Sequence, residues 1–385
     1  MVTIAGSGMG KYNFDNINLD FSEFDSIFCD KNYNEKLPNL IKGSFKEIKE
    51  QILQNLDKNI LYVVSGSPLF YSGAALIIAK AKQQNIPFTI HDNTSSLSYM
   101  LAKTGVSFTK TNVLSLHGKT DVDLKALLTN DYTFVLCDEK TPSILQEVLY
   151  YLKEEDITIT VGERFGYEDE KIYTSTLKDL TPKMPYVLLI KKNYKDLPTI
   201  SPEDTIEHEN GMITKTYKRH LSLQNLELEP NMLLWDIGAG SGSVSIDGYK
   251  RYKVKTILFE KNEKRAKMIQ QNLTNHKIIN TKLYVGEASI LYKQENSTPQ
   301  RIFVGGGGEK VISELDYLVE RLDKNGILVA NFVTLKHLNL AINVLEKANI
   351  AFEIKTISLT TYKMKLLMPE AERVLHQIII KKENL

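Results

Sequence analysis

Three glycines at alternate positions follow an acidic residue at the end of an apolar segment. Asp236 precedes Gly238, Gly240 and Gly242, after which helix-compatible residues resume. Such glycines let the backbone turn tightly, so that a ligand can contact bare amides at a helix N-terminus. A dinucleotide fingerprint has two residues between its second and third glycines, whereas here Ser241 stands alone between them. The spacing therefore favours S-adenosylmethionine over NAD. The predicted cofactor residues of this loop are Asp236, Gly238, Ala239, Gly240, Ser241 and Gly242.

A second carboxylate strengthens this interpretation. Glu260 ends the strand-like segment from Lys255 to Phe259, one strand–helix–strand unit after the glycine loop. A carboxylate at that position can accept hydrogen bonds from both ribose hydroxyls of a nucleoside. The alternative, a tight turn without ligand, explains the glycines but not Glu260. A later strand end adds further predicted cofactor residues, namely Gly286, Glu287 and Ala288.

Two more glycine-rich turns lie near the start of the chain. The strand-like residues Val2 to Ala5 lead into one, and Ile60 to Val64 lead into the other. Ligands of α/β proteins gather at the carboxyl ends of strands, which makes a second site plausible. Ordinary turn chemistry, with Pro68 setting a turn, explains these residues equally well. The candidate cofactor residues are Gly6, Gly8, Gly10, Ser65, Gly66 and Ser67.

Several residues are candidates for contact with a substrate. The run from Gly305 to Gly308 follows a strand and would let a flat molecule approach the backbone, with Gly305 also near the cofactor. Basic side chains ahead of Asp236 could clamp carboxylates, or form a solvated face. Polar residues at the end of a later strand could bind substrate or satisfy the strand end. His117 is more simply structural than a ligand contact. The candidate substrate residues are Thr214, Lys215, Arg219, Gly306, Gly307, Asn331 and Thr334, and His220 lies beside the basic residues Lys215 and Arg219.

Length and composition limit the possible classes of protein. With 385 residues, two domains are expected, and a charged, proline-containing stretch from Lys191 to Gly211 places the boundary between residues 195 and 196. A net charge of +1 provides no field for steering onto nucleic acid or a membrane surface. Cys29 and Cys137 have no metal-ligand spacing, so neither a zinc site nor a disulfide framework is predicted. We expect a soluble cytoplasmic protein.

Strand-like and helix-like segments alternate along the chain, which predicts an α/β fold with mainly parallel sheets. After the boundary, strands are expected up to Asp236, up to Glu260, near Leu283 and up to Val304. Helical spacing of apolar residues then runs from 311 to 322, followed by a strand over residues 327–333. We predict a doubly wound sheet in the second domain, with its ligand crevice at the switch point.

These segments also carry a resemblance over nearly the whole chain. The first half resembles the tetrapyrrole methylases through VTIAGSGMG, SGSPLFYSGA, NTSSLSYMLAKTG, SLHGK and VGERFGYEDEKIYTSTLKDL. The second half is similar to a Rossmann-like methyltransferase through GMITKTYKRH, LLWDIGAGSGSVSID, LFEKN, IFVGGGGEK and LVANFVTLKHL. Their order in one chain resembles the fused precorrin-6Y C(5,15)-methyltransferases (decarboxylating) of cobalamin biosynthesis. The resemblance adds Ser95 and Ser96 to the candidate cofactor residues.

The resemblance implies two methyl transfers from S-adenosylmethionine. The first domain would methylate carbon 5 of a precorrin or cobalt-precorrin, and the second would methylate carbon 15 and decarboxylate the ring C acetate. It also implies a homo-oligomer. The protein mainly has to align donor and acceptor, and such positioning is worth about 7–11 kcal/mol.

One departure from the family pattern affects the first domain. The family usually has an acid at the third place of the segment that reads SGSP here, and this chain has Ser67. One alternative is therefore that only the second half is catalytic, while the first is a tetrapyrrole-binding module. Another alternative, methylation of RNA, is disfavoured because the chain has no basic stripe with interleaved aromatic residues.

Overall fold

The structure is a computed structural model that describes residues 1–10, 19–30, 37–362 and 368–382. The chain consists of two compact units. The first unit comprises Met1–Val122, Ala126–Pro142 and Thr158–Lys192, and the second unit comprises Asp123–Lys125, Ser143–Ile157 and Asn193–Leu385. A domain boundary between residues 195 and 196 stays a prediction.

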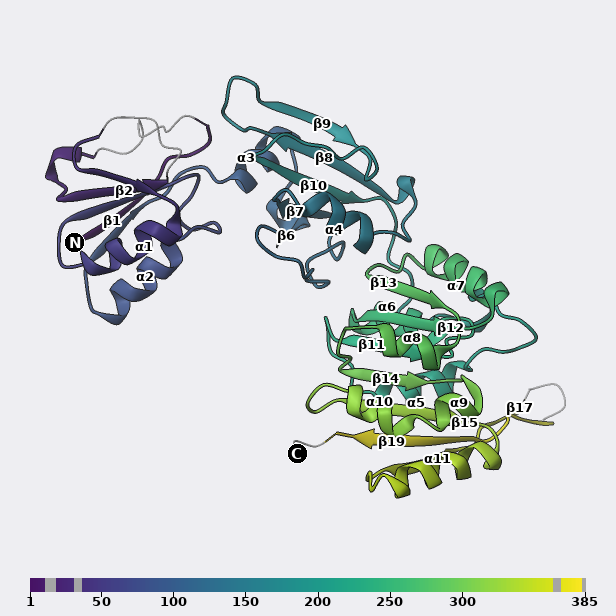
Figure 1. Cartoon of the computed structure of the whole chain (residues 1–385). Helices are drawn as coiled ribbons and strands as arrows, with labels where there is room; N and C mark the ends of the chain where they lie inside the picture. Colours follow the sequence, from purple (N-terminus) through teal and green to yellow (C-terminus); the bar gives the residue numbers. More distant parts are fainter. Residues whose placement is uncertain (11–18, 31–36, 363–367, 383–385) are drawn as a thin grey trace. The chain divides into compact units, whose positions relative to one another are not determined.

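The first unit begins with a parallel sheet whose strand order is β3-β2-β4-β1-β5 (Figure 1). Its elements are β1 (Val2–Gly6), η1 (Phe21–Glu23), β2 (Ser26–Asp30), β3 (Leu40–Gly43), α1 (Phe45–Gln54), β4 (Ile60–Val64), α2 (Ala74–Gln83) and β5 (Phe88–His91). Ile48 and Ile52 of α1 and Ile77 of α2 pack against Val2 and Ile4, so both helices cover one face. Because the strands are parallel, the loops that follow β1, β4 and β5 meet at one edge.

A second, mixed sheet has the strand order β6-β7-β10-β8-β9. This part of the chain contains α3 (Ser96–Thr104), η2 (Phe108–Lys110), β6 (Thr111–Ser115), β7 (Tyr132–Leu136), α4 (Thr141–Val148), η3 (Glu154–Asp156), β8 (Ile157–Glu163), β9 (Lys171–Ser175) and β10 (Tyr186–Lys192). Leu97, Met100 and Leu101 of α3 pack against Phe134 and Val187 of this sheet.

The second unit is built on a seven-stranded sheet with the order β13-β12-β11-β14-β15-β19-β16. Its first five strands are parallel, and β19 pairs antiparallel with both β15 and β16. The strands are β11 (Leu233–Ile237), β12 (Lys255–Glu260), β13 (Thr281–Val285), β14 (Arg301–Val304), β15 (Ile327–Phe332), β16 (Glu353–Ile357) and β19 (Leu375–Lys381), with β17 (Thr360–Tyr362) and β18 (Pro369–Ala371) forming a separate pair. The α/β class and the Rossmann-like arrangement of the second half are confirmed.

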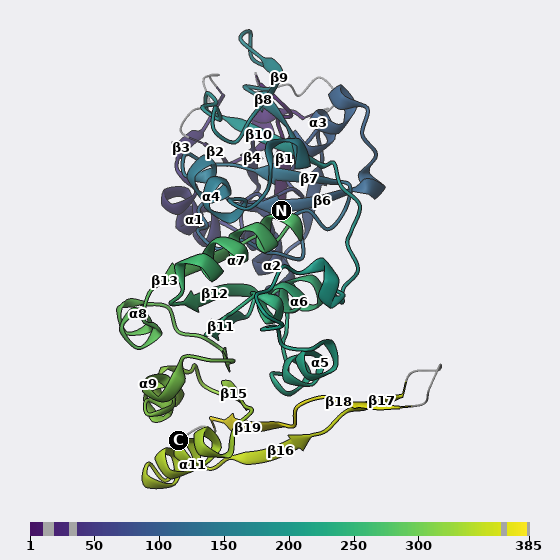
Figure 2. The ribbon, with the colours of Figure 1, turned by 90° about the vertical axis from the view of Figure 1, so that its right-hand side faces the viewer.

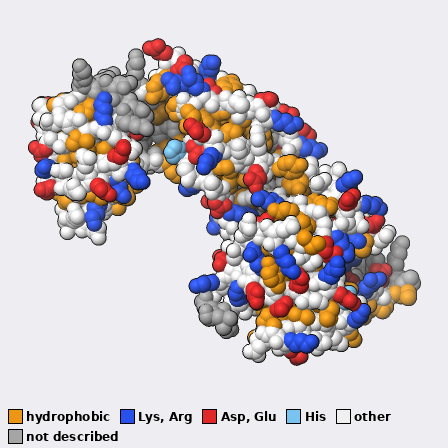
Figure 3. Space-filling view, in the orientation of Figure 1, with side chains coloured by type: hydrophobic (Ala, Val, Ile, Leu, Met, Phe, Trp, Pro, Cys, Tyr) orange, Lys and Arg blue, Asp and Glu red, His pale blue; other side chains and the backbone are white. Residues whose placement is uncertain are grey.

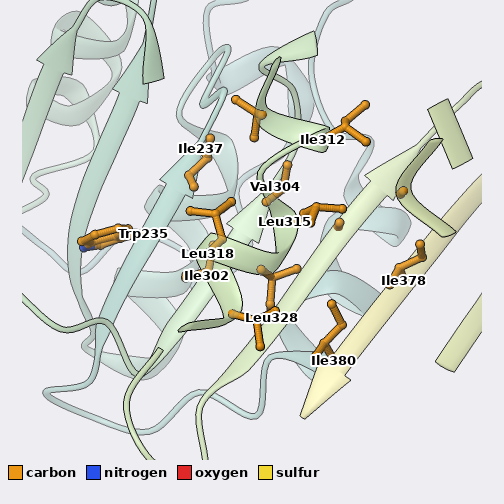
Figure 4. Close-up of a cluster of buried hydrophobic side chains, with 14 of the residues drawn as sticks. Trp235, Ile237, Ile302, Val304, Ile312, Leu315, Leu318, Leu328, Ile378 and Ile380 are labelled. Carbon is orange, nitrogen blue, oxygen red and sulfur yellow. The ribbon is translucent and has the colours of Figure 1, made fainter. Parts of the chain in front are cut away.

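Helices cover both faces of this sheet, as Figure 2 shows for α5 and α6 on one side and α8, α9 and α11 on the other. The helices are η4 (Glu203–Thr205), α5 (Thr216–Asn225), α6 (Ser243–Tyr252), α7 (Glu263–Asn275), α8 (Ala288–Gln294), α9 (Gly308–Ile312), α10 (Leu315–Arg321) and α11 (Leu335–Lys347). Trp235, Ile237, Leu318, Ile378 and Ile380 belong to the larger core cluster (Figure 4). This core extends from β11 to β19 and so fixes the edge at which the loops of β11, β12 and β14 lie.

The apolar stripe from 311 to 322 differs from the single helix that its spacing indicates. It forms α9 and α10, with a break at Ser313 and Glu314. Glu314 accepts hydrogen bonds from Tyr292 and Lys293 of α8, and this side-chain anchoring accompanies the break. Val311, Ile312, Leu315, Leu318, Val319 and Leu322 are nevertheless all buried.

Charged side chains of both signs are interspersed on the face seen in Figure 3, in line with the net charge of +1. In the described part of the chain, no helix combines the length and the apolar character that a bilayer crossing requires.

Candidate active site

The loop between β11 and α6 has a backbone that requires glycine. Gly238, Gly240 and Gly242 have φ angles of 71°, 61° and 75°, which side chains disfavour. A Cβ atom on Gly238 would lie 2.6 Å from the Cα atom of Gly306, in the loop after β14. The Gly238 amide donates to the Phe259 carbonyl oxygen at 2.9 Å. The loops of three adjacent strands therefore converge closely, as the glycine spacing predicts.

Glu260 lies at the centre of this convergence. One carboxylate oxygen accepts from the Gly240 amide and the other from the Asn262 amide, both at 2.9 Å. The side chain is 3 % exposed, and it still lines a cavity of about 680 Å³. The nearest cation, Arg265, is 3.8 Å away. These contacts fix the orientation of a carboxylate that a ligand in the cavity can reach.

Asp236 lies beneath the loop rather than on the cavity wall. Its Oδ2 atom accepts from the Ser245 hydroxyl at 2.7 Å and from the Ser245 amide at 3.3 Å. Its Oδ1 atom, like the Ser241 hydroxyl, is buried and has no partner among the described residues. Burial raises the pKa of Asp236 to about 6, with a smaller contribution from the charge of Glu260. An unsatisfied buried carboxylate oxygen is costly, which is typical of a functional site.

The cavity brings together most of the predicted residues of the second unit. Gly242 caps α6, Gly286 donates its amide to the Glu260 carbonyl oxygen, and neither is part of the lining. Asn331 contributes to the lining and also bonds to Ser222 and Gln377. The predicted residues that line the cavity are Thr214, Lys215, Gly238, Ala239, Gly240, Ser241, Glu260, Glu287, Ala288, Gly305, Gly306, Gly307 and Asn331.

Two predicted substrate residues are placed elsewhere. Arg219 is fully buried and pairs with Asp247 at 2.6 Å, while its guanidinium also donates to the carbonyl oxygens of Thr214 and Ser201. Thr334 caps α11 by accepting from the His337 amide. Burial with Asp247 gives Arg219 a structural role, whereas the substrate contact predicted for the exposed Thr334 stays a prediction. A guanidinium that buries itself against a carboxylate from another helix leaves no signal in the local sequence.

His220 lies at a second, shallower cavity of about 630 Å³ with Tyr217 and Glu203. Burial lowers the pKa of His220. In the first unit, the Nδ1 atom of His117 lies 3.3 Å from the Cys137 carbonyl oxygen, after β6. Of the two histidines, His220 lies at a cavity other than the one that the glycine loop of the second unit lines.

Beside the predicted Lys215, the cavity has basic side chains that the sequence did not single out, namely Lys218, Lys261 and Arg373. Lys218 pairs with Glu372 at 2.8 Å, and Lys215 pairs with Glu203 at 2.6 Å. Lys261 and Arg373 line the cavity and form no ion pair among the described residues. Lys261 could have been found from its place directly after Glu260. Arg373 could not, because it lies far along the chain and reaches the cavity only through the placement of β19.

In the first unit, the loops after β1 and β4 interlock. The Gly66 amide donates to the Gly8 carbonyl oxygen at 2.9 Å, and Gly8 donates back at 3.3 Å. A Cβ atom on Gly6 would lie 2.4 Å from the Gly66 carbonyl oxygen. A Cβ atom on Gly10 would lie closer still, 2.0 Å from the Gly166 carbonyl oxygen. The predicted glycines thus meet at one edge of the sheet, where close approach excludes side chains.

The polar candidates of this edge differ in exposure. Ser65 is exposed, whereas Ser67 is 6 % exposed and donates its hydroxyl to Asp92 at 2.5 Å. Ser95 caps α3 by accepting from the Ser98 amide, and Ser96 is the first residue of that helix. Asp92 follows β5 and was not predicted, because nothing in the local sequence links it to Ser67.

Comparisons with known proteins match both halves of the chain. Residues 22–181 match the family described as tetrapyrrole (corrin/porphyrin) methylases, and residues 205–362 match the family described as precorrin methyltransferase domain. A precorrin-6Y C(5,15)-methyltransferase [decarboxylating] of Sinorhizobium is 27 % identical over 74 % of this chain and 70 % of its own length. A probable cobalt-precorrin-6B C(15)-methyltransferase (decarboxylating) of Pyrobaculum calidifontis is 29 % identical over 40 % of this chain and 81 % of its own.

Among solved structures, the crystal structure of a precorrin-6Y C5,15-methyltransferase from Geobacter metallireducens is similar to part of the chain. It is 29 % identical, with a TM-score of 0.46, and the match covers 49 % of this chain and all of that one.

Proposed function

Because the chain belongs to the precorrin-6Y C(5,15)-methyltransferase (decarboxylating) family, we propose that it methylates a precorrin or cobalt-precorrin at carbons 5 and 15. The same proposal includes loss of the ring C acetate carboxyl group as carbon dioxide, with S-adenosylmethionine as methyl donor. The observation that carries it is the cavity of the second unit, where Glu260 and the glycine loop lie beside Lys261 and Arg373, which form no ion pair among the described residues.

The residues of the second unit fit S-adenosylmethionine. Glu260 presents a fixed carboxylate for ribose hydroxyls, and the glycine loop leaves room for close approach. The Ser241 hydroxyl, which lines the cavity and has no hydrogen-bond partner among the described residues, is a polar group that a ligand can satisfy. When bound, the cofactor supplies an electrophilic methyl group on its sulfonium. The protein residues hold donor and acceptor in line, which is the main catalytic requirement.

The basic residues suit an acceptor rich in carboxylates. Lys261 and Arg373 can pair with acidic side groups of the tetrapyrrole, Arg373 in bidentate fashion. Removing water from the carboxylate that is lost favours decarboxylation. The electron pair that remains on carbon can pass into the conjugated macrocycle, and a proton that is then added to this carbon completes the methyl group.

Mass spectrometry of the tetrapyrrole product tests this proposal. Purified protein is incubated with S-adenosylmethionine and the precorrin, with and without cobalt. A gain of two methyl groups and loss of carbon dioxide is expected. A gain of one methyl group with loss of carbon dioxide would support the second candidate, in which the first unit only binds the tetrapyrrole. No change in mass, in protein shown to bind the cofactor, would contradict the assignment. Light scattering would check the homo-oligomer that the family implies.

A further inference from the structure

A carboxylate stands beside the Ser65–Pro68 turn, although the turn itself contains no acidic residue. The Ser67 hydroxyl donates to the Oδ1 atom of Asp92 at 2.5 Å. The same hydroxyl oxygen accepts from the Leu69 amide at 3.1 Å, so its single proton is directed at Asp92. The family resemblance leads one to expect an acid at position 67. Ser67 stands there instead, and it binds the carboxylate of Asp92 from another loop.

This contact is not a local turn interaction. Ser67 follows β4 and Asp92 follows β5, and β1 lies between these two strands in the sheet. The bond therefore bridges the carboxyl end of β1. Gly6 at that end has no space for a side chain, since a Cβ atom would lie 2.4 Å from the Gly66 carbonyl oxygen and 3.1 Å from the Asn93 Cβ atom. Both loops are thus held closely around the glycine turn.

The chemistry of the pair differs from that of a serine alone. Asp92 is exposed, and Ser67 is its one hydrogen-bond partner among the residues that the structure describes. Its remaining lone pairs can accept hydrogen bonds from ribose hydroxyls or from the ammonium group of a methionine moiety. Hydrogen bonds to an ionised acceptor are about twice as strong as those between neutral groups. The glycine cradle and the oriented carboxylate together fit a nucleoside with a cationic tail.

We propose that Asp92, oriented by Ser67, is the carboxylate that binds S-adenosylmethionine in the first unit. The aspartate on the loop after β5 takes the place of the acid that the resemblance leads one to expect at position 67. This inference rests on the proposed function of the first unit. Asp92 supplies the negative charge that Ser67 lacks. The absence of an acid at position 67 is therefore no reason to regard the first unit as a tetrapyrrole-binding module only.

Calorimetric titration of the full chain with S-adenosylhomocysteine tests the proposal without requiring turnover. Wild-type protein should bind two equivalents. Asp92→Asn should weaken one site by about tenfold or more and leave the other unchanged. The matched control is Asp57→Asn, which removes an exposed charge just before β4, at the opposite edge of the same sheet. The exchange variant, Ser67→Asp with Asp92→Ser, should recover most of the affinity, and thermal melting should show that each variant is folded.

The outcomes distinguish the role of Asp92 from the proposed methyl transfer by the first unit. If the wild-type protein binds two equivalents and Asp92→Asn binds both with unchanged affinity, the role of Asp92 is overturned and the proposed function stands. A single wild-type site that is lost in Glu260→Gln would overturn both the role of Asp92 and methyl transfer by the first unit. An equal loss in Asp57→Asn would also overturn the proposal, because it would show a general effect of charge.

Discussion

Asp236, which is buried beneath the glycine loop, carries a cost in stability. Its pKa is about 6 in the folded protein and 3.8 in a model peptide. The folded state therefore binds its proton more tightly, and the stability that this proton provides is present below pH ~4 and lost as the pH rises through about 6. Asp236→Asn keeps the shape of the protonated side chain and removes this loss.

The variant should consequently unfold less readily than wild type at pH ~8, by about 3 kcal/mol, and equally readily near pH ~4. Urea unfolding followed at both pH values is the measurement. Equal midpoints at the higher pH would show that Asp236 does not carry a buried charge there.

The Glu260 carboxylate should determine how tightly the second unit binds its cofactor. Glu260→Gln should weaken cofactor binding by the second unit by about 10- to 100-fold, because charge-assisted hydrogen bonds to ribose are replaced by neutral ones. Calorimetric titration measures the change, with Glu346→Gln on the exposed surface of α11 as a matched control. An unchanged affinity would mean that the ribose is bound elsewhere.

Single residues show what a sequence can and cannot reveal about the site. The place of Glu260 at the cavity could be predicted, because it follows from the distance along the chain between Glu260 and the glycine loop. Arg219 was misplaced because its partner, Asp247, belongs to another helix, and burial with that partner decides its role. Asp92 was missed for the same reason, since its partner lies 25 residues earlier.

At the scale of elements, two glycines of one strand–loop–helix unit make a matched pair. Gly238→Ala places a Cβ atom 2.6 Å from the backbone of Gly306 at a φ of +71°, so it should destabilise the second unit and abolish cofactor binding. Gly248→Ala lies within α6, where the nearest atom would be 3.5 Å away. It should stabilise the protein by up to about 1 kcal/mol. Thermal melting of both variants checks this, and similar melting temperatures would contradict it.

The Arg219–Asp247 ion pair ties α5 to α6 and to the segment at Ser201. Arg219→Ala would leave a buried carboxylate without its partner, which costs about 3–5 kcal/mol. We expect a lower urea midpoint and an unchanged KM for tetrapyrrole in the fraction that remains folded. A raised KM with normal stability would restore the substrate role.

The elements themselves were predictable to different degrees. Parallel strands up to β15 follow from apolar runs that alternate with helical spacing. The break between α9 and α10 does not, because the anchoring of Glu314 by α8 is a tertiary contact. β19 was not anticipated either, although the consecutive residues Ile378, Ile379 and Ile380 are a signal of a buried strand.

For the whole molecule, the proposal implies that the two methyl transfers are separable. Glu260→Gln should yield a product that has gained one methyl group and kept its acetate carboxyl. Asp92→Asn should yield one that has gained one methyl group and lost carbon dioxide. Mass spectrometry of both products distinguishes these outcomes, and loss of both methylations in either variant would contradict independent sites.

The position of β19 has a consequence for biosynthesis. Among the described strands, β16 pairs only with β19, and β19 also covers the edge of β15. During translation, β15 and β16 leave the ribosome before their common partner has been made. Until β19 has been made, the edges of β15 and β16 that will pair with it remain unpaired. Unpaired strand edges promote association between nascent chains. Completion of this sheet is the insertion of a late strand between two early ones, and chaperones that shield strand edges would act at that step.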